Sequence, residues 1–272
     1  MESFTYFHHR IEQVNRNDYQ FHDHDFFEIY WFLDGDVEYL VEGSSFQLKP
    51  YEMVVVPPRM MHRALHKDTS VYERIVCFMQ PEFFTQYYCE SYLSELQQVP
   101  IRLTAEQVFS SGLTGLLERL RQYTNHFAKT DRSVWLSFIL ELLCILHQIG
   151  EEKALVCKDT PVQRIISHLN QHMEEPISLE QLAKNMYLSM EHFCRSFKKA
   201  TGYTIVSYLN HIRINRVREL ALQGMTLNEA SIQAGFSNYA HFYKAFYKEN
   251  GLSPRQGLYR KEEMKPGINK TI

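Results

Sequence analysis

Histidine and carboxylate side chains gather early in the chain at a spacing that suits metal ligation or hydrogen bonding to a small molecule. A single residue, Asp23, separates His22 from His24. Glu28 follows four positions after His24, and His62 lies in a later segment. Imidazole and carboxylate groups together are ligands for iron, manganese and zinc. On a β-strand, residues of equal parity point to one face, which would add Tyr30 to this set. The sequence therefore predicts a polar site on one face of a strand.

The spacing continues to Gly35 as H-x-H-x3-E-x6-G and resembles the first motif of the cupin proteins. The spacing from Pro57 to His62 resembles the second cupin motif, with Arg59 in place of its glycine. The resemblance implies a β-barrel, and in metal cupins three such histidines and one glutamate bind a divalent metal. A metal-dependent cupin enzyme is therefore one interpretation of this part of the chain.

Alternating hydrophobicity predicts the strands of such a barrel. Residues 37–41 alternate, turn at Gly43-Ser44 and return through residues 46–48, which predicts a β-hairpin. Residues 53–56 form an apolar run that two prolines end, and residues 72–78 are similar, so both predict buried strands. Many short strands favour a cupin-like antiparallel β-barrel over residues 1–100.

Residues 101–154 change to helical periodicity, with strong helices expected over 104–127 and 131–149. The second of these carries an apolar stripe that must be buried, either against the barrel or against a second copy of the chain. We favour the second copy, which predicts a homodimer through helices about 104–149. The apolar stretch is too short for the ~20 residues of a membrane-spanning helix, so no membrane is expected.

The formal charge of −3 hides an asymmetry between the two halves of the chain. Residues 1–154 contain 13 Lys+Arg and 22 Asp+Glu, which gives −9, whereas residues 155–272 contain 16 and 10, which gives +6. A basic domain can meet a polyanion, and an acidic one is repelled by it. The 272 residues suit two domains, and only the second is expected to bind nucleic acid.

Residues 155–272 read as an all-α domain that contains one helical pattern twice. His192-Phe193 recurs as His241-Phe242 after 49 residues, and each copy has a second phenylalanine four residues on. A capping-box pattern, a short helix, a turn and a second helix predict two helix-turn-helix motifs, at about 178–199 and about 227–248. A long helix at 205–222 would fix the distance between the second helices, which must be ~34 Å apart to enter successive major grooves.

Residues about 160–262 resemble the DNA-binding domain of the AraC/XylS family of bacterial transcription regulators. The stretches that carry the resemblance are ISLEQLA at 177–183, RSFK at 195–198, AGFS at 234–237 and GLSPR at 251–255. Tyr187 departs from the pattern, because the family often has glycine in this turn. The resemblance implies a transcription regulator, more often an activator that contacts RNA polymerase, with a cupin-like domain that senses a small-molecule effector.

The resemblance and the helical periodicity assign side chains to double-stranded DNA. Seven residues on the outer faces of the second helices are predicted to read bases: Glu191, Cys194, Arg195, Tyr239, Ala240, Tyr243 and Lys244. Arg195 is the best candidate for a bidentate contact with guanine, and Glu191 could accept from cytosine. Four basic residues are predicted to meet phosphates, with a solvated basic face as the alternative: Lys198, Lys199, Arg213 and Lys248.

Six residues of the barrel are predicted to line an effector pocket: His22, His24, Glu28, Tyr30, Tyr39 and His62. Aromatic and imidazole groups suit a sugar or another small polar metabolite. Sensor domains of this family frequently show the same pattern of histidines, so no metal or other cofactor is expected, and His22, His24, Glu28 and His62 are only the candidate ligands.

Two alternatives to an effector-controlled regulator stay open. One is a metal-dependent cupin enzyme with a DNA-binding appendage, and the other is a ligand-independent regulator whose barrel is a dimer scaffold. The N-terminus shows no readable signal peptide and the five cysteines include no CxxC pair. These features favour a cytoplasmic protein with reduced thiols, and a regulator rather than an enzyme.

Overall fold

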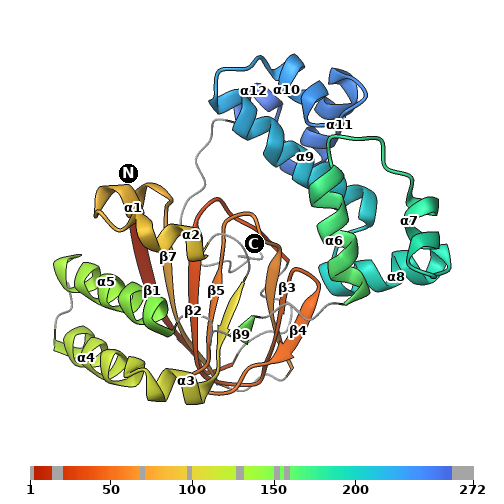
Figure 1. Ribbon diagram of the computed structural model, residues 1–272. Coiled ribbons are helices and arrows are strands. Elements are labelled where there is room, and N and C mark those ends of the chain that lie inside the picture. The colour runs from red at the N-terminus through yellow and green to blue at the C-terminus, as the bar shows by residue number, and fades with distance from the viewer. Residues whose placement is uncertain are drawn as a thin grey trace. The chain divides into compact units, whose positions relative to one another are not determined.

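The structure is a computed structural model, and it describes residues 3–13, 21–67, 71–96, 100–126, 132–149, 154–155 and 160–258. The chain forms two compact units, and the main division between them follows residue 157. Strands dominate the first unit and helices make up the second, as Figure 1 shows. The predicted two-domain fold class, with an antiparallel sheet domain before a helical domain, is confirmed.

Two sheets build the N-terminal unit. The strands are β1 (Phe4–Ile11), β2 (Phe27–Asp34), β3 (Val37–Val41), β4 (Ser44–Gln47), β5 (Met53–Val56), β6 (His62–His66), β7 (Tyr72–Met79), β8 (Ile101–Leu103) and β9 (Ala154–Leu155). An antiparallel six-stranded sheet has the order β1-β7-β2-β5-β8-β9, and a three-stranded sheet has the order β4-β3-β6. Rings of β3 meet rings of β2 at 4.9 Å, so the two sheets enclose a shared interior, here called the barrel interior.

The predicted strands 53–56 and 72–78 match β5 and β7, and the hairpin matches β3 and β4. Its two turn residues, Glu42 and Gly43, both have positive φ, at 44° and 75°, which suits the right-handed twist of the flanking strands. β8 and β9 lie in the region that we expected to be wholly helical. β8 pairs with β5, so the sheet continues beyond residue 100, and strands this short leave no readable period.

Alternate residues of β2 separate the two faces of the larger sheet. Phe27, Ile29 and Trp31 belong to a core that the flanking helices cover, while Glu28 and Tyr30 point into the barrel interior. All five side chains are buried, because helices cover one face and the second sheet covers the other. The polar groups of β2 are therefore placed where water is largely excluded.

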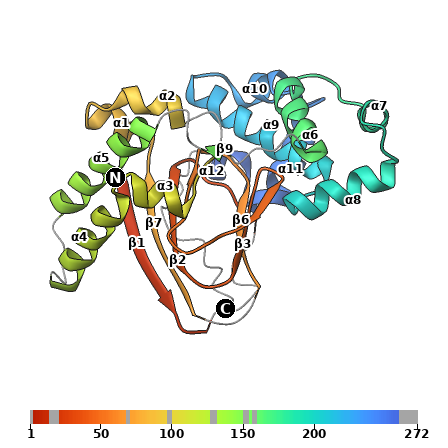
Figure 2. The ribbon, with the colours of Figure 1, turned by 60° about the horizontal axis from the view of Figure 1, so that its bottom comes forward.

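The helices of the N-terminal unit are α1 (Glu82–Gln86), a 3-10 turn η1 (Glu90–Tyr92), α2 (Leu93–Leu96), α3 (Ala105–Ser110), α4 (Leu113–His126) and α5 (Arg132–Ile149). Gly112, with φ +82°, separates α3 from α4 where the sequence predicted one helix. Figures 1 and 2 show α4 and α5 side by side along the sheet. None of the described helices has the length and apolarity needed to cross a membrane.

The apolar stripe of α5 is buried within its own chain. Trp135, Phe138 and Leu142 share one core with Phe27 and Trp31 of β2. The expectation that this stripe needs a second copy is wrong, and the alternative, that it packs on the barrel, is confirmed. A homodimer through these helices stays a prediction, and it would have to use their other faces.

The C-terminal unit consists of α6 (Pro161–His172), α7 (Leu179–Asn185), α8 (Met190–Thr201), α9 (Ile205–Leu222), α10 (Leu227–Gln233), α11 (Tyr239–Asn250) and α12 (Pro254–Gly257). Both helix-turn-helix motifs and the long connecting helix are confirmed by α7–α8, α9 and α10–α11. The capping box at Thr226 is complete, with Glu229 as its partner. At Ser178 only the serine half forms, because the Gln181 amide bonds Asn185 instead.

The turn of each helix-turn-helix motif contains one residue with a positive φ angle, but the residue type differs between the two turns. Gly235 has φ +92°, and a Cβ built on it would lie 2.4 Å from the Met173 carbonyl oxygen, so only glycine fits. Tyr187 has φ +56° and is almost fully exposed, at 97%. A side chain in the left-handed region costs roughly 1–2 kcal/mol, so Tyr187 carries backbone strain that glycine would not.

Candidate functional site

The first predicted reading helix, α8, presents its expected base-reading residues on one exposed face. Its N-cap Ser189 accepts a hydrogen bond from the His192 amide at 3.3 Å, and Phe193 is fully buried. Glu191, Cys194 and Arg195 are all exposed. Arg195 forms an ion pair with Glu191, one helical turn away. Exposed ion pairs are weak in water, so a base edge can replace the carboxylate as the partner of this guanidinium.

The second reading helix, α11, repeats this arrangement. Its N-cap Asn238 accepts from the His241 amide at 2.8 Å, and Phe242 and Phe246 are fully buried. Three predicted base readers are exposed: Ala240, Tyr243 and Lys244. Tyr239 is only half-exposed, because its ring packs on Phe242 at 5.7 Å, and it therefore belongs partly to the core.

Three of the four predicted phosphate contacts are exposed lysines in the last turns of these helices: Lys198, Lys199 and Lys248. The prediction for Arg213 is wrong. Its side chain is buried at 7% exposure, and its guanidinium donates to the carbonyl oxygens of Met173 at 2.7 Å and Glu175 at 2.9 Å. Burial also lowers the pKa of Arg213. Arg213 therefore fastens the segment before α7 to α9.

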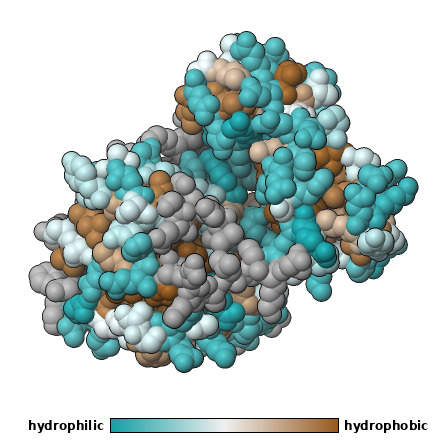
Figure 3. Space-filling view, viewed as in Figure 1, coloured by the Kyte–Doolittle hydropathy of each residue, from teal (hydrophilic) through white to brown (hydrophobic). Residues whose placement is uncertain are grey.

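The outer face of α11 contains one aromatic that we did not predict. Tyr247 is 55% exposed and stacks on Tyr243, with ring centroids 6.4 Å apart and planes at 4°. The four-residue spacing of the two tyrosines was the signal for it. Figure 3 shows the visible face of this unit as mainly hydrophilic with isolated hydrophobic patches.

The four candidate metal ligands of the barrel converge. His22, His24, Glu28 and His62 each offer an atom, and these atoms all lie within 4.8 Å of one another. Glu28 Oε2 lies 3.1 Å from His24 Nε2 and 3.3 Å from His62 Nε2. His24, Glu28 and His62 are buried, whereas His22 is half-buried. The spacing predicted this set correctly, with His62 brought in from β6.

The path of the chain through this cluster differs from the strand that we expected. β2 begins only at Phe27, and residues 25–26 form a bend. His22 pairs with His62 across an isolated bridge, and the Arg59 amide donates to the His24 carbonyl at 2.7 Å. Arg59, which stands where cupins have glycine, has φ +66°. Equal parity therefore gave the correct grouping although residues 23–26 are not a strand.

Charge at the cluster is balanced between the carboxylate and the imidazoles. Burial by itself would raise the pKa of Glu28, but hydrogen bonds from His24 and His62 hold that pKa well below its usual value. Burial would lower the pKa of His62, but the hydrogen bond and charge of Glu28 raise it. The carboxylate is thus kept ionised in a place from which water is largely excluded.

The remaining predicted pocket residues continue from this cluster across the barrel interior. Tyr39 lies 6.3 Å from the His62 ring and 4.9 Å from the Tyr30 ring. Its hydroxyl is buried without a hydrogen-bond partner among the described residues. Sequence reasoning missed Tyr72, whose hydroxyl bonds that of Tyr30 at 2.7 Å, and Arg74, whose guanidinium lies 5.3 Å from the Tyr30 ring. Tyr72 and Arg74 are two positions apart in the predicted strand 72–78, so their side chains point to the same face, and this spacing could have identified both.

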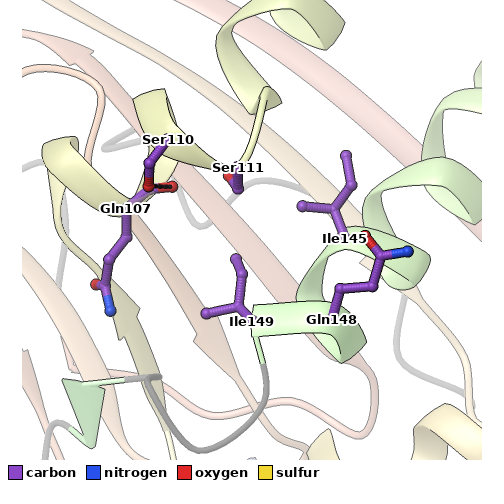
Figure 4. Close-up of a pocket in the computed structure, with 6 residues that line it drawn as sticks. All are labelled: Gln107, Ser110, Ser111, Ile145, Gln148 and Ile149. Carbon is purple, nitrogen blue, oxygen red and sulfur yellow. Dashed lines mark hydrogen bonds between the residues drawn. The ribbon is translucent and has the colours of Figure 1, made fainter.

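A separate small pocket lies between α3 and the end of α5 (Figure 4). Its volume is about 240 Å³, below the ~300–1,000 Å³ of ordinary ligand sites, and it includes none of the predicted pocket residues. Its lining consists of amides, hydroxyls and isoleucines: Gln107, Ser110, Ser111, Ile145, Gln148 and Ile149. The lining contains no charged group.

A ligand-binding barrel joined to paired helix-turn-helix motifs defines a class of two-domain regulators, and family models agree. Residues 9–133 match the model of an AraC-like ligand binding domain, and residues 182–261 match a helix-turn-helix domain. Together they cover about three quarters of the chain. The protein belongs to the AraC family of transcription regulators.

Similar proteins are transcription regulators. The HTH-type transcriptional activator RhaS of Salmonella arizonae is 25% identical over 250 residues, 86% of this chain and 85% of the relative. The uncharacterized HTH-type transcriptional regulator YfiF of Bacillus subtilis is 22% identical over 264 residues, 94% of this chain and 83% of the relative. RhaS of Salmonella schwarzengrund is 27% identical over 144 residues, about half of its length.

Solved structures resemble the chain more loosely. ToxT of Vibrio cholerae aligns over 95% of this chain and 98% of its own, at 12% identity and a TM-score of 0.38. The DNA-binding domain of AdpA, in complex with a target DNA, aligns over 37% of this chain and 91% of its own, at 23% identity and a TM-score of 0.34.

Proposed function

We propose that the protein is a sequence-specific DNA-binding transcription regulator in which α8 and α11 read adjacent major grooves. The observation that carries the proposal is the duplicated design of these helices. Each starts at a polar N-cap, buries a phenylalanine pair and leaves the opposite face exposed, and α9 joins the two within one compact unit. The positive end of each helix dipole favours nearby phosphate.

In this proposal the exposed faces of α8 and α11 contact the DNA bases. Arg195 would exchange its partner Glu191 for a guanine edge, and Tyr243 and Lys244 would read the second groove. Phosphate contacts are assigned to the exposed lysines Lys198, Lys199 and Lys248. Arg213 is excluded from this set because its guanidinium is already bonded to backbone carbonyls.

Binding to operator variants tests these roles. A duplex is selected from a random-sequence pool with the full chain, and affinity is then measured on all its single-base variants. Arg195→Ala should remove preference at one position, worth ~1–3 kcal/mol, and leave the others unchanged. Lys199→Ala should weaken all sequences alike and reduce the salt slope by ~1. Lys49→Ala, which removes an exposed lysine of the N-terminal unit outside the proposed dimer face, is the control.

An equal loss on every operator variant for Arg195→Ala would refute its base-reading role. Failure of the full chain to enrich any sequence from the pool would refute the proposed function itself. The two results are separable, because a phosphate contact changes affinity without changing sequence preference.

Effector control belongs to the barrel interior in this proposal. The barrel interior offers hydrogen bonds and ring faces to a small polar molecule, such as a sugar. These groups are the buried Tyr39 hydroxyl, the hydrogen-bonded hydroxyls of Tyr30 and Tyr72, and the imidazoles. An effector works only if it prefers one of two states of the protein. Operator binding measured with and without a panel of monosaccharides tests this, and binding unchanged by every tested compound would favour the ligand-independent regulator.

Activation is the mode that the RhaS relatives support, because those proteins are named activators. Contact with RNA polymerase and a cytoplasmic location are proposed from the family resemblance alone. The relatives are transcription regulators, which supports a regulator rather than a cupin enzyme. A homodimer would use the outer faces of α4 and α5, where Arg119 and Glu141 form an exposed ion pair at 2.6 Å. Sedimentation at high and low salt tests it, since a polar interface should weaken with salt.

A further inference from the structure

We infer that α11 recognises the C5-methyl group of thymine through the ring of Tyr243, which Tyr247 holds in position. The inference rests on the proposed function, because it states which chemical group of the DNA the second reading helix contacts. Its three parts are the composition of the exposed face, the packing of the tyrosine rings and the charge around them.

The exposed face of α11 differs in chemistry from that of α8. The repeat of 49 residues aligns four exposed positions of the two helices: Glu191 with Ala240, Cys194 with Tyr243, Arg195 with Lys244, and Lys198 with Tyr247. Three of the four residues are charged in α8, whereas three of the four are alanine or tyrosine in α11. The two helices are therefore suited to different groups on the edges of base pairs.

In the major groove, an apolar side chain has one specific partner. Every base pair presents hydrogen-bonding groups there, and thymine alone adds a methyl group. Ala240 has no polar atom in its side chain, and Tyr243 lies three residues further on, on the same face of the helix. The alanine methyl and the tyrosine ring together form an apolar surface that gains free energy by covering a thymine methyl.

Neighbouring rings hold Tyr243 in place before DNA binds. Its ring centroid lies 6.4 Å from that of Tyr247, with the planes at 4°, and 6.5 Å from that of Tyr239, with the planes at 53°. Tyr239 is fixed in turn, because its ring packs on the buried Phe242 at 5.7 Å. A ring that is already held loses little conformational entropy on binding. Tyr247 therefore acts as a positioning residue for Tyr243.

The charge around the tyrosines favours a polyanion over an apolar protein surface. Lys244 and Lys248 are exposed and follow the two tyrosines directly in sequence. The single acidic residue of α11 is Glu249, and its Oε1 lies 2.7 Å from Nδ1 of the buried His211 in α9. The stacked rings are 40% and 55% exposed. An accessible aromatic pair bordered by lysines matches base edges bordered by phosphates.

Single deoxyuridine substitutions test the inference, because each one removes a methyl group and keeps every hydrogen-bonding group of the base pair. The probe is the duplex that the full chain selects from a random-sequence pool, with each thymine replaced in turn. Binding by the wild-type chain should weaken by about 3–5-fold at one or two positions, as expected for the burial of one methyl-sized group.

Variants of the two tyrosines assign this loss to α11. Tyr243→Ala should bind the thymine and uridine duplexes equally, whereas Tyr243→Phe, which keeps the ring, should retain the preference. Tyr247→Ala should reduce the preference and Tyr247→Phe should restore it. Alanine is the strongest helix former, so these exposed positions should tolerate it, and circular dichroism checks the fold. Tyr88→Ala, which removes a 92% exposed tyrosine of the N-terminal unit, is the matched control and should keep the full preference.

Equal binding of the thymine and uridine duplexes by the wild-type chain would overturn the inference, as would an unchanged preference in Tyr243→Ala or a selected duplex without thymine. An unchanged preference in Tyr247→Ala would remove its positioning role. Failure to enrich any sequence refutes the proposed function itself, whereas enrichment of a duplex that tolerates uridine everywhere refutes only the reading of thymine.

Discussion

The turn between α10 and α11 gives the sharpest prediction, which concerns Gly235→Ala. A Cβ at Gly235 would lie 2.4 Å from the Met173 carbonyl oxygen and 2.9 Å from Arg213 Nε. The Met173 oxygen is also the acceptor for Arg213 Nε, at 2.7 Å. The substitution therefore strains the backbone and forces apart a buried hydrogen bond at the same time.

The two effects can be added for an order of magnitude. A non-glycine residue in the left-handed region costs roughly 1–2 kcal/mol, and loss of a hydrogen bond to a charged group costs about 1.5–3 kcal/mol. Gly235→Ala should then lower the free energy of unfolding by about 2.5–5 kcal/mol. Gly251→Ala is the matched control, because Gly251 has φ +65° but nothing within 4 Å of its built Cβ. It should cost only the roughly 1–2 kcal/mol of backbone strain.

The tryptophans make the assay specific to one unit. The chain has 2 Trp, Trp31 and Trp135, and both lie in the N-terminal core. In urea unfolding of the full chain, far-ultraviolet circular dichroism follows the helices of both units, whereas tryptophan fluorescence follows the N-terminal unit alone. Gly235→Ala should shift only the dichroism transition of the C-terminal helices. Equal destabilisation by Gly235→Ala and Gly251→Ala would refute the steric reasoning.

Four further outcomes follow from single residues. Tyr187→Gly should stabilise the C-terminal unit by about 0.5–1 kcal/mol in the same urea assay, because relief of left-handed strain exceeds the added chain entropy, and a loss of stability would contradict this. Bound operator DNA should protect Cys194 on α8 from iodoacetamide but leave the exposed Cys144 reactive, as peptide mass spectrometry can check. Cys77 should stay unmodified in the folded protein, since burial raises its pKa to about 12, and rapid labelling would argue against this packing. Arg213→Gln should lower the urea midpoint yet leave the salt slope of DNA binding unchanged, whereas a reduced slope would restore its phosphate role.

Local patterns were sufficient for the elements and for much of the candidate site. The repeat at His192 and His241 identified α8 and α11, because caps, turns and i, i+4 phenylalanines depend on neighbours in sequence. The spacing from His22 to Glu28 also grouped side chains that converge in the structure, although the segment between them bends rather than continuing the strand.

Charge and hydrophobicity by themselves did not reveal which partner a side chain takes. Arg213 reads as one more basic residue of a basic half, but it is buried against the carbonyls of residues 173 and 175. The apolar stripe of α5 was compatible with a second copy, which we favoured, or with the barrel, and only the shared core with Trp31 decides for the barrel.

The sequence by itself determined the two-domain plan, the acidic and basic halves and the duplicated helix-turn-helix motifs. Tertiary structure decided the cluster around Glu28 and the approach of Arg74 to the Tyr30 ring. It also decided the burial of the Tyr39 hydroxyl, which has no hydrogen-bond partner among the described residues. The physical reason is the distance along the chain over which each kind of interaction acts. Periodicity and capping act over a few residues, whereas burial and the meeting of distant side chains depend on how the two sheets close over one another.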